Sequence, residues 1–164
     1  GGAERFESVR AALEAVDEAA ELVCIHDAVR PCVLESWIDA AFAEAGKTGA
    51  AILAARLTGT IKKVADSGVI DRTVPREGLW EAQTPQVFRK DLIRRAYAEM
   101  PADFQPTDDA QAVERLGHPV SVVETDHRNI KITGPGDMSI ASVIVKDMGR
   151  KAKGPLGAFE EAQW

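Results

Sequence analysis

Residues 49–55 read Gly-Ala-Ala-Ile-Leu-Ala-Ala, a short apolar run without a charged side chain. A run of this length and character is typical of a strand that is covered on both faces of a sheet. The preceding residues, from Glu35 to about Ala45, carry apolar side chains at helical spacing, and Gly46 follows near the end of that pattern. A helix that leads directly into a buried strand indicates an α/β fold.

The same alternation is present nearer the N-terminus. Apolar residues at helical spacing follow Ser8, whose hydroxyl can accept a hydrogen bond from a first-turn amide, and they lead into the apolar run Leu22-Val-Cys-Ile-His26. Alternating helices and strands predict a Rossmann-like, mainly parallel sheet flanked by helices. Ligands bind outside the carboxyl ends of the strands in such sheets, and Asp27 directly follows one of them.

Residues 60–75 follow a different pattern. Two extended runs, Thr60–Val64 and Val69–Val74, flank the turn sequence Asp66-Ser-Gly68, which predicts a β-hairpin. A two-stranded ribbon is marginal by itself, so its apolar side chains need a surface to pack on. We therefore expect a projecting arm over about residues 58–78 that forms a homodimer with a second copy of the chain.

The alternation of helices and strands resumes after the arm. We expect an extended segment from Leu79 to Phe88, a helix over Asp91–Met100, a helix capped by Thr107, strands at Val120–Val123 and Asn129–Thr133, and a closing helix from Pro135 to about Met148. Residues 1–150 are expected to form a single domain, and residues 151–164 a C-terminal tail.

Composition excludes several classes of protein. The net charge of −6 argues against a surface that coats nucleic acid, so an anionic ligand would be held by a few local cations. No apolar run approaches the roughly eighteen residues that a membrane helix needs, and no positively charged leader precedes one, which predicts a cytoplasmic protein without membrane contact. Cys24 and Cys32 lack both CxxC spacing and the density of a disulfide scaffold, which indicates reduced thiols.

A series of short motifs occurs along the chain in a particular order. They are Gly1-Gly-Ala-Glu-Arg5, Ser8-Val9, His26-Asp-Ala-Val-Arg-Pro31, Leu79-Trp-Glu-Ala-Gln-Thr-Pro-Gln86 with Phe88, Thr107-Asp-Asp-Ala110 and Asn129-Ile-Lys-Ile-Thr133. Each motif is weak alone, but their order and spacing together resemble the 2-C-methyl-D-erythritol 4-phosphate cytidylyltransferases of the non-mevalonate isoprenoid pathway. The resemblance extends from Gly1 to about Val145.

The resemblance implies transfer of the CMP part of CTP to the phosphate of methylerythritol phosphate, with release of pyrophosphate and use of Mg²⁺. Such a reaction requires a protein that aligns the phosphates and neutralises their charge. Two alternatives remain open at this point. One is a ribitol- or other sugar-alcohol-phosphate cytidylyltransferase, and the other is a non-catalytic dimerisation module.

Three charged residues are the main candidates for this chemistry. Asp27 follows a strand end and suits Mg²⁺ together with phosphate oxygens, and the resemblance places it at the CTP and the metal; a turn aspartate is the alternative. Arg30 can grip a substrate phosphate as a fork, or form an ordinary surface ion pair. Lys131 matches the lysine of the family's Asn-Ile-Lys-Ile-Thr motif, and the resemblance implies that it helps to bind the substrate phosphate. An exposed, solvated strand residue is the alternative. We expect these three side chains to converge on one anion-binding site.

Further residues are assigned by the resemblance. Thr84 is similar to a threonine that hydrogen-bonds the substrate, although a structural turn is the alternative. Gly2 and Ser8 match positions that read the cytosine ring, and helix capping is the alternative role for Ser8. Thr60 and Arg76, at the base of the arm, correspond to residues that reach the substrate of the neighbouring subunit. If so, each active site is shared between two subunits.

Two features limit the prediction. His26, His118 and His127 lack the spacing of a metal cluster and receive no role. The family also holds the triphosphate with a glycine-rich loop and a Pro-Lys pair, and residues 1–164 contain no counterpart of them, nor a GxGxxG or GxxxxGK[ST] motif. We therefore expect a domain without its N-terminal loop, and these 164 residues alone to be inactive.

Overall fold

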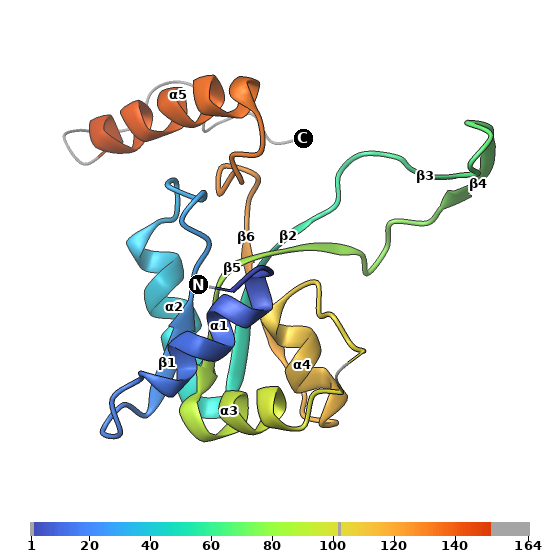
Figure 1. Ribbon diagram of the computed structural model, residues 1–164. Coiled ribbons are helices and arrows are strands. Elements are labelled where there is room, and N and C mark those ends of the chain that lie inside the picture. The colour runs from blue at the N-terminus through green and yellow to red at the C-terminus, as the bar shows by residue number, and fades with distance from the viewer. Residues whose placement is uncertain (1, 102, 152–164) are drawn as a thin grey trace.

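A computed structural model of the chain describes residues 2–101 and 103–151. Figure 1 shows a central sheet with helices on both sides and a long arm that projects from it. The strands are β1 Leu22–Ile25, β2 Ala50–Arg56, β3 Ile61–Val64, β4 Ile70–Val74, β5 Trp80–Arg89 and β6 Ser121–Thr125. The helices are α1 Arg5–Glu14, α2 Glu35–Thr48, α3 Lys90–Ala98, α4 Asp109–Arg115 and α5 Pro135–Lys151.

The central sheet has the order β1-β5-β2-β6. Strand β5 pairs antiparallel with both β1 and β2, while β2 and β6 pair parallel, so β1, β2 and β6 all run in one direction. The predicted Rossmann-like α/β fold is thereby confirmed. The segment predicted to be extended at Leu79–Phe88 is the strand that runs the other way. It does so because the chain leaves the sheet along β2, turns at the tip of the arm and returns along β5.

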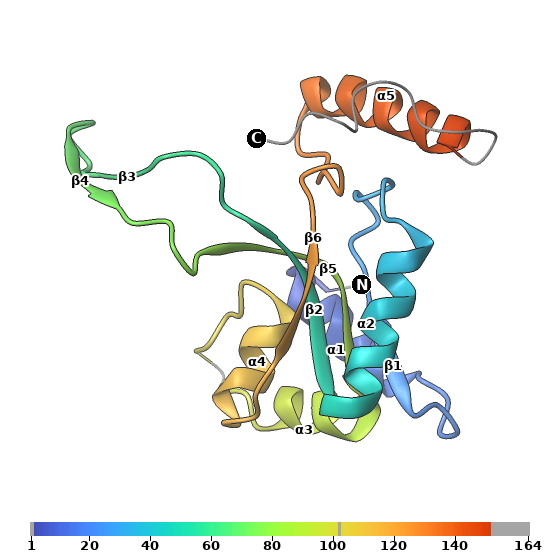
Figure 2. The same cartoon turned by 180° about the vertical axis from the view of Figure 1, so that it is seen from behind.

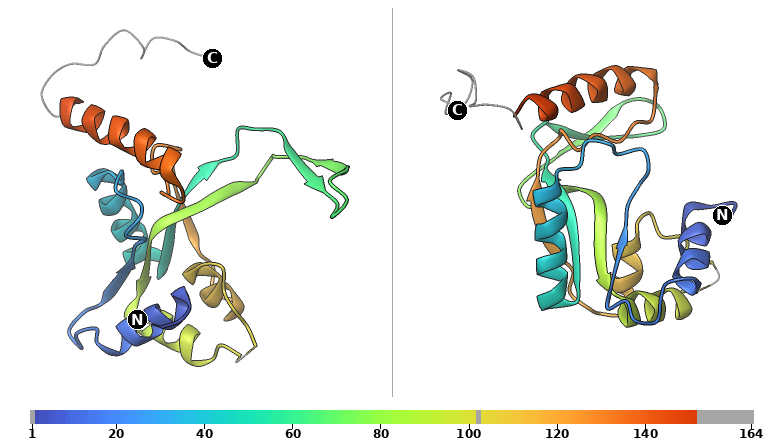
Figure 3. Two further views of the ribbon diagram at one scale, coloured as in Figure 1. Left: turned by 45° about the horizontal axis from the view of Figure 1, so that its top comes forward. Right: turned by 90° about the vertical axis from the view of Figure 1, so that its left-hand side faces the viewer.

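The sheet is the middle of three layers (Figure 3). Helices α1, α3 and α4 pack on one face, where Ile52 and Phe88 are buried, and α2 packs on the other, against Leu53 and Val87. Successive side chains of a strand point to opposite faces, so adjacent residues of β2 enter different cores. All residues of β2 except its last are buried, which confirms the interpretation of residues 49–55 as a strand covered on both faces.

Helix α2 ends three residues later than expected. Its C-cap is Gly49, with φ of 93°, and the Gly49 amide donates to the Ala45 carbonyl oxygen at 2.8 Å. A left-handed backbone at a helix end favours glycine, and a Cβ at Gly49 would also lie 3.0 Å from Nε2 of His118. Gly46 lies within the helix, so the first glycine after the apolar pattern does not end it.

Three local predictions were wrong. Helix α1 begins at Arg5 with Glu4 as its N-cap, so Ser8 lies inside the helix. Helix α4 is capped by Asp108 rather than Thr107, and the Asp108 carboxylate accepts from the Gln111 amide at 3.0 Å. Residues 129–133 form no strand, because their contacts are with loops and buried side chains rather than with a neighbouring strand. Of the predicted tail, only Lys151 lies within the described residues, and it ends α5.

The predicted hairpin is confirmed. Strands β3 and β4 pair antiparallel, with Ile61 opposite Val74, and they lie far from the central sheet in two opposite views (Figures 1 and 2). Apolar side chains of the arm are open to solvent, with exposed fractions of 51% for Val64, 65% for Val69 and 57% for Ile70. The arm therefore carries apolar surface that its own chain does not cover.

Candidate active site

The site begins in the loop that leaves β1. The Asp27 amide donates to the Thr84 hydroxyl at 2.9 Å, and the Arg30 amide donates back to the Asp27 carbonyl oxygen at 3.0 Å. The first bond ties the loop to β5, and the second closes a turn that brings Arg30 beside Asp27. The carboxylate is thus fixed at the carboxyl end of β1, where the sequence placed it.

His26 stabilises the same turn. Its Nε2 lies 3.1 Å from the Arg30 carbonyl oxygen, and its Nδ1 lies 3.0 Å from the Thr84 hydroxyl oxygen. A carbonyl oxygen can only accept, so Nε2 carries a proton, and in the neutral ring Nδ1 accepts from Thr84. His26 therefore has a structural role, which agrees with the absence of a metal-ligand pattern around it in the sequence.

Residues 129–132 approach this loop from the other side. Asn129 is fully buried, and its side-chain amide donates to Gln83 Oε1 and to the Thr84 carbonyl oxygen, both at 2.9 Å. The Ile132 amide donates to the Val29 carbonyl oxygen at 2.9 Å. These bonds hold the segment without a β-ladder and place Lys131 over the loop of Asp27.

The three predicted charges meet at one point. Nζ of Lys131 lies 3.2 Å from Asp27 Oδ2, and Nε of Arg30 lies 3.6 Å from the same oxygen. Arg30 Nη1 also donates to the Asn129 carbonyl oxygen at 2.7 Å. Arg30 is only 6% exposed, whereas the Lys131 side chain is 43% exposed. Lys131 therefore lies at the surface of the site, and Arg30 lies behind it.

Arg5 is a fourth charged residue of the site, and sequence reasoning missed its role. Its Nε donates to Asp27 Oδ1 at 3.1 Å, and its Nη2 donates to Asp109 Oδ2 at 2.7 Å. Arg5 is the last residue of the motif Gly1–Arg5, and Asp109 belongs to the motif Thr107–Ala110. Membership of these motifs was the signal in the sequence that could have pointed to the two residues. By sequence pattern alone, Asp109 is an ordinary first-turn acid that favours the dipole of its helix.

These contacts determine the charge state of Asp27. Burial alone would raise the pKa of its carboxyl, but the hydrogen bonds and charges of Lys131 and Arg5 outweigh burial, so its pKa lies below the usual range. For Arg5, burial alone would lower the pKa of the guanidinium. The hydrogen bonds and negative charges of Asp109 and Asp27 outweigh burial, so its pKa is raised. Asp27 is therefore ionised and Arg5 charged at neutral pH.

A pocket of about 410 Å³ opens over these charges. It is lined by Arg5 and Ser8 from α1, by Asp27 and its neighbours after β1, and by Lys131. The Ser8 hydroxyl accepts from the Gly2 amide at 2.9 Å, which places Gly2 at the rim. A Cβ at Gly2 would lie 2.2 Å from Cβ of Glu7, so glycine alone fits this close approach.

Other predicted residues lie outside this pocket. Thr84 is 4% exposed, and its hydroxyl is engaged by Asp27 and His26 below the pocket. Thr60 and Arg76 are exposed at the base of the arm, where Arg76 donates to the Thr58 carbonyl oxygen. The structure thus brings Ser8, Asp27 and Lys131 into one pocket but leaves the two arm residues apart from it.

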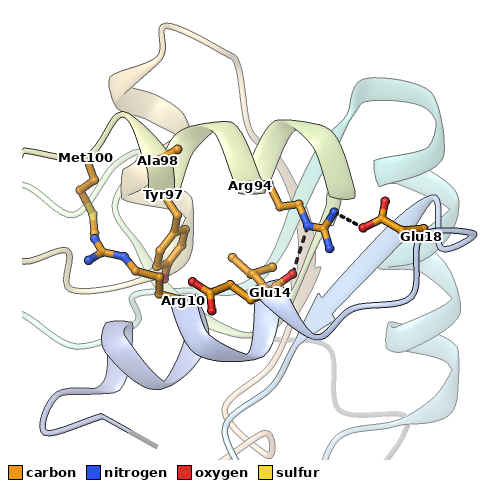
Figure 4. A pocket seen from close by; sticks show the side chains of 8 residues that line it. Arg10, Glu14, Glu18, Arg94, Tyr97, Ala98 and Met100 are labelled. Atoms are coloured by element: carbon orange, nitrogen blue, oxygen red, sulfur yellow. Dashed lines mark hydrogen bonds and ion pairs between the residues drawn. The ribbon is translucent and has the colours of Figure 1, made fainter.

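A larger pocket, of about 680 Å³, lies between α1 and α3 (Figure 4). Its walls include Arg10, Glu14, Arg94 and Tyr97, and none of the predicted site residues. Arg94 is already engaged there, since it donates to the Leu13 carbonyl oxygen at 3.0 Å and to Glu18 at 2.9 Å. The smaller pocket is therefore the better candidate for an anionic ligand.

Within residues 2–101 and 103–151, no three His, Cys, Asp or Glu side chains are grouped as a metal cage. Asp27 is the carboxylate among the residues that line the 410 Å³ pocket. In the same part of the chain, no helix has the length and apolar character needed to cross a membrane.

Comparison with known proteins decides the family. The family model described as "IspD: 2-C-methyl-D-erythritol 4-phosphate cytidylyltransferase" matches residues 1–147. The chain belongs to the IspD family. The motifs that suggested this resemblance are those that supply Asp27, Arg30 and Lys131 to the site, so sequence and geometry agree.

Individual IspD relatives support this assignment. The 2-C-methyl-D-erythritol 4-phosphate cytidylyltransferase of Syntrophus aciditrophicus is 45% identical over 147 residues, covering 89% of this chain and 63% of the relative. The corresponding enzyme of Rhodopirellula baltica is 48% identical over 158 residues, which cover 90% of this chain and 64% of that relative. The crystal structure of the Thermus thermophilus enzyme matches with a TM-score of 0.83 at 35% identity, over 89% of this chain and 71% of that one. The chain thus spans less than two thirds of the length of the two curated relatives.

Proposed function

We propose that the protein transfers CMP from CTP to 2-C-methyl-D-erythritol 4-phosphate and releases pyrophosphate. The observation that carries this proposal is the pocket in which Asp27, Lys131 and Arg5 converge beside Ser8, in a chain of the IspD family. Three cations surround Asp27 there, whereas the whole chain has a net charge of −6. This local excess of positive charge suits a ligand that carries several phosphates.

The reaction needs positioning and charge neutralisation rather than covalent catalysis by the protein. An oxygen of the acceptor phosphate forms a bond to the α-phosphorus of CTP, and the bond from that phosphorus to the bridging oxygen of the β-phosphate breaks. The electron pair leaves with pyrophosphate. Charge accumulates on oxygens around the α-phosphorus during this exchange, so fixed cations at that place lower the barrier.

The contacts of each side chain suggest its role. Lys131, at the pocket surface, is proposed to contact a substrate phosphate directly. Arg30 is buried, so it is proposed to neutralise the site from behind while holding Asp27 and the Asn129 segment in place. Thr84 is proposed to position Asp27 through its hydroxyl, which accepts from the Asp27 amide. Its proposed hydrogen bond to the substrate requires that hydroxyl to exchange one of its present partners, the Asp27 amide or His26. Gly2 and Ser8 are proposed to contact the cytosine ring.

Asp27 is proposed to hold Mg²⁺. The ion commonly binds through one or two carboxylates together with substrate phosphates and water, and a single ionised carboxylate in an anion-binding pocket fits this pattern. When bound, Mg²⁺ would withdraw charge from the phosphate oxygens. For Mg²⁺ to bind, an oxygen of Asp27 would have to separate from Lys131 or Arg5. The phosphates of the substrate would then become the new partners of these two cations.

The acceptor and the metal can be tested together. Titration of full-length protein with CTP is expected to release heat only when Mg²⁺ is present, and pyrophosphate should then appear with methylerythritol phosphate. A panel that includes ribitol phosphate distinguishes the sugar-alcohol acceptors. Turnover with ribitol phosphate but not with methylerythritol phosphate would identify ribitol phosphate as the acceptor. Failure to bind CTP at all would favour a non-catalytic dimerisation module. CTP and a sugar-alcohol phosphate are charged metabolites, which supports a reaction in the cytoplasm.

The arm is proposed to form a homodimer in which Thr60 and Arg76 reach the substrate of the neighbouring subunit. The exposed side chains of Val64, Val69 and Ile70 support this, because a second copy would bury them. Light scattering should report a dimer for the wild type and a shift towards monomer for Val69→Asp with Ile70→Lys. Lys63→Ala, on the same arm, should leave the dimer intact. A monomeric wild type at micromolar concentration would contradict the proposal.

A further inference from the structure

Asp109 links the active site to the core behind it. One carboxylate oxygen, Oδ1, accepts from the Tyr97 hydroxyl at 2.5 Å, and the other, Oδ2, accepts from Arg5 Nη2 at 2.7 Å. Arg5 in turn donates through Nε to Asp27. A continuous chain of hydrogen bonds therefore runs from Tyr97 on α3, through Asp109 on α4 and Arg5 on α1, to the carboxylate at the pocket.

The burial of Asp109 is not explained by helix capping. Asp108 already caps α4, and Gln86 of β5 accepts from the Ala110 amide at 3.0 Å, so the end of this helix is held without the Asp109 side chain. Asp109 is nevertheless 0% exposed. Burying a carboxylate is costly unless charged or polar partners replace water, and here those partners are Arg5 and Tyr97.

Arg5 needs such a fixed partner. Its side chain is 36% exposed, and it lines the pocket from a helix near the start of the described chain. A long, half-exposed arginine samples many rotamers unless its guanidinium is held. Asp109 holds one nitrogen of the guanidinium and leaves Nε directed at Asp27. Tyr97 prevents the Asp109 carboxylate from turning, because it occupies the oxygen that Arg5 does not use.

We infer that Asp109 and Tyr97 are positioning residues for cytidylyl transfer, which act through Arg5 on the orientation of Asp27 at the phosphate site. The inference rests on the proposed function. Tyr97 also lines the pocket between α1 and α3, so its ring has a packing role as well (Figure 4). The hydroxyl and the ring are separable, because phenylalanine keeps the ring and removes only the bond to Asp109.

A double-mutant cycle in the full-length protein tests this inference. Tyr97→Phe is expected to lower kcat/KM for CTP about tenfold, as is common for groups that orient an active-site residue. In an Arg5→Lys background the same substitution should change kcat/KM less than about twofold, because the residue through which it acts is already altered. Ile93→Val is the matched control: it lies on the same helix and in the same core cluster, is fully buried, and should leave kcat/KM unchanged.

A second readout does not depend on activity. The Nε–H proton of Arg5, followed by NMR, should exchange with solvent several-fold faster in Tyr97→Phe and in Asp109→Asn than in the wild type or in Ile93→Val. Equal effects of Tyr97→Phe in both Arg5 backgrounds, or unchanged Arg5 exchange, would overturn the positioning role. If the Arg5 Nε–H proton of the wild type exchanges slowly but the protein transfers no CMP, the proposed function is rejected instead.

Discussion

Lys131→Ala is expected to lower kcat/KM for cytidylyl transfer by roughly 10²–10³-fold, the usual cost of removing one charge-stabilising donor. Lys131 has the most exposed side chain of the three cations beside Asp27, at 43% against 36% for Arg5 and 7% for Arg30. Unlike Arg5, it has no second carboxylate partner among the residues that the structure describes, so it can leave Asp27 and contact a substrate phosphate. Arg5 and Arg30 remain beside Asp27 in the variant, and the fold should keep its stability to within about 1 kcal/mol. Pyrophosphate release and thermal unfolding measure the two quantities.

Lys47→Ala is the matched control for this prediction. Lys47 is also an exposed lysine beside a carboxylate, with Nζ 3.6 Å from Oε2 of Glu44 on α2. The same loss of charge away from the pocket and the arm should leave turnover near the wild-type rate. A Lys131 variant as active as the Lys47 variant would remove Lys131 from the phosphate site.

Asp27→Asn is expected to have the second large effect, on both activity and stability. The substitution keeps the size of the side chain but leaves Arg5, Arg30 and Lys131 around a neutral amide. Removing one partner of a buried ion pair commonly lowers the free energy of unfolding by about 3 kcal/mol. The same loss is expected here, because Arg30 is buried and its charge would have neither Asp27 nor water beside it. Loss of the only proposed protein ligand should also abolish the Mg²⁺ dependence of CTP binding. Denaturant unfolding and calorimetry with and without Mg²⁺ measure both effects.

Asp126→Asn serves as the comparison for Asp27. Asp126 also pairs with an arginine, Arg128, at 2.6 Å, but both side chains are more than 40% exposed. Surface pairs of this kind contribute little, so the variant should lose less than about 1 kcal/mol and retain full activity. If Asp27→Asn resembled Asp126→Asn in stability and in Mg²⁺ response, the central place of Asp27 in the site would be refuted.

Local patterns were sufficient for much of the fold. The runs at residues 22–26 and 49–55, the hairpin sequence at residues 60–75 and the helical spacing before Gly46 each predicted an element that the structure contains. These predictions succeed because burial imposes a period of about two on strands and of about 3.6 on helices, and because turns favour particular residues. The same is true of Asp27, whose place after a strand follows from the chain itself.

Contacts between distant segments determined the remainder. The insertion of β5 between β1 and β2 depends on where the chain returns, which a local pattern does not contain. The cap at Asp108 and the helix end at Gly49 are local, but the neighbouring Thr107 and Gly46 matched the same patterns. Local patterns were enough to predict most of the helices and strands, the arm, and Asp27, Arg30 and Lys131 as residues of the site. The packed structure was needed to show that Arg30 lies behind Lys131 and that Arg5 joins Asp27 to Asp109. A hydrogen bond between residues 104 positions apart forms only after the helices have packed.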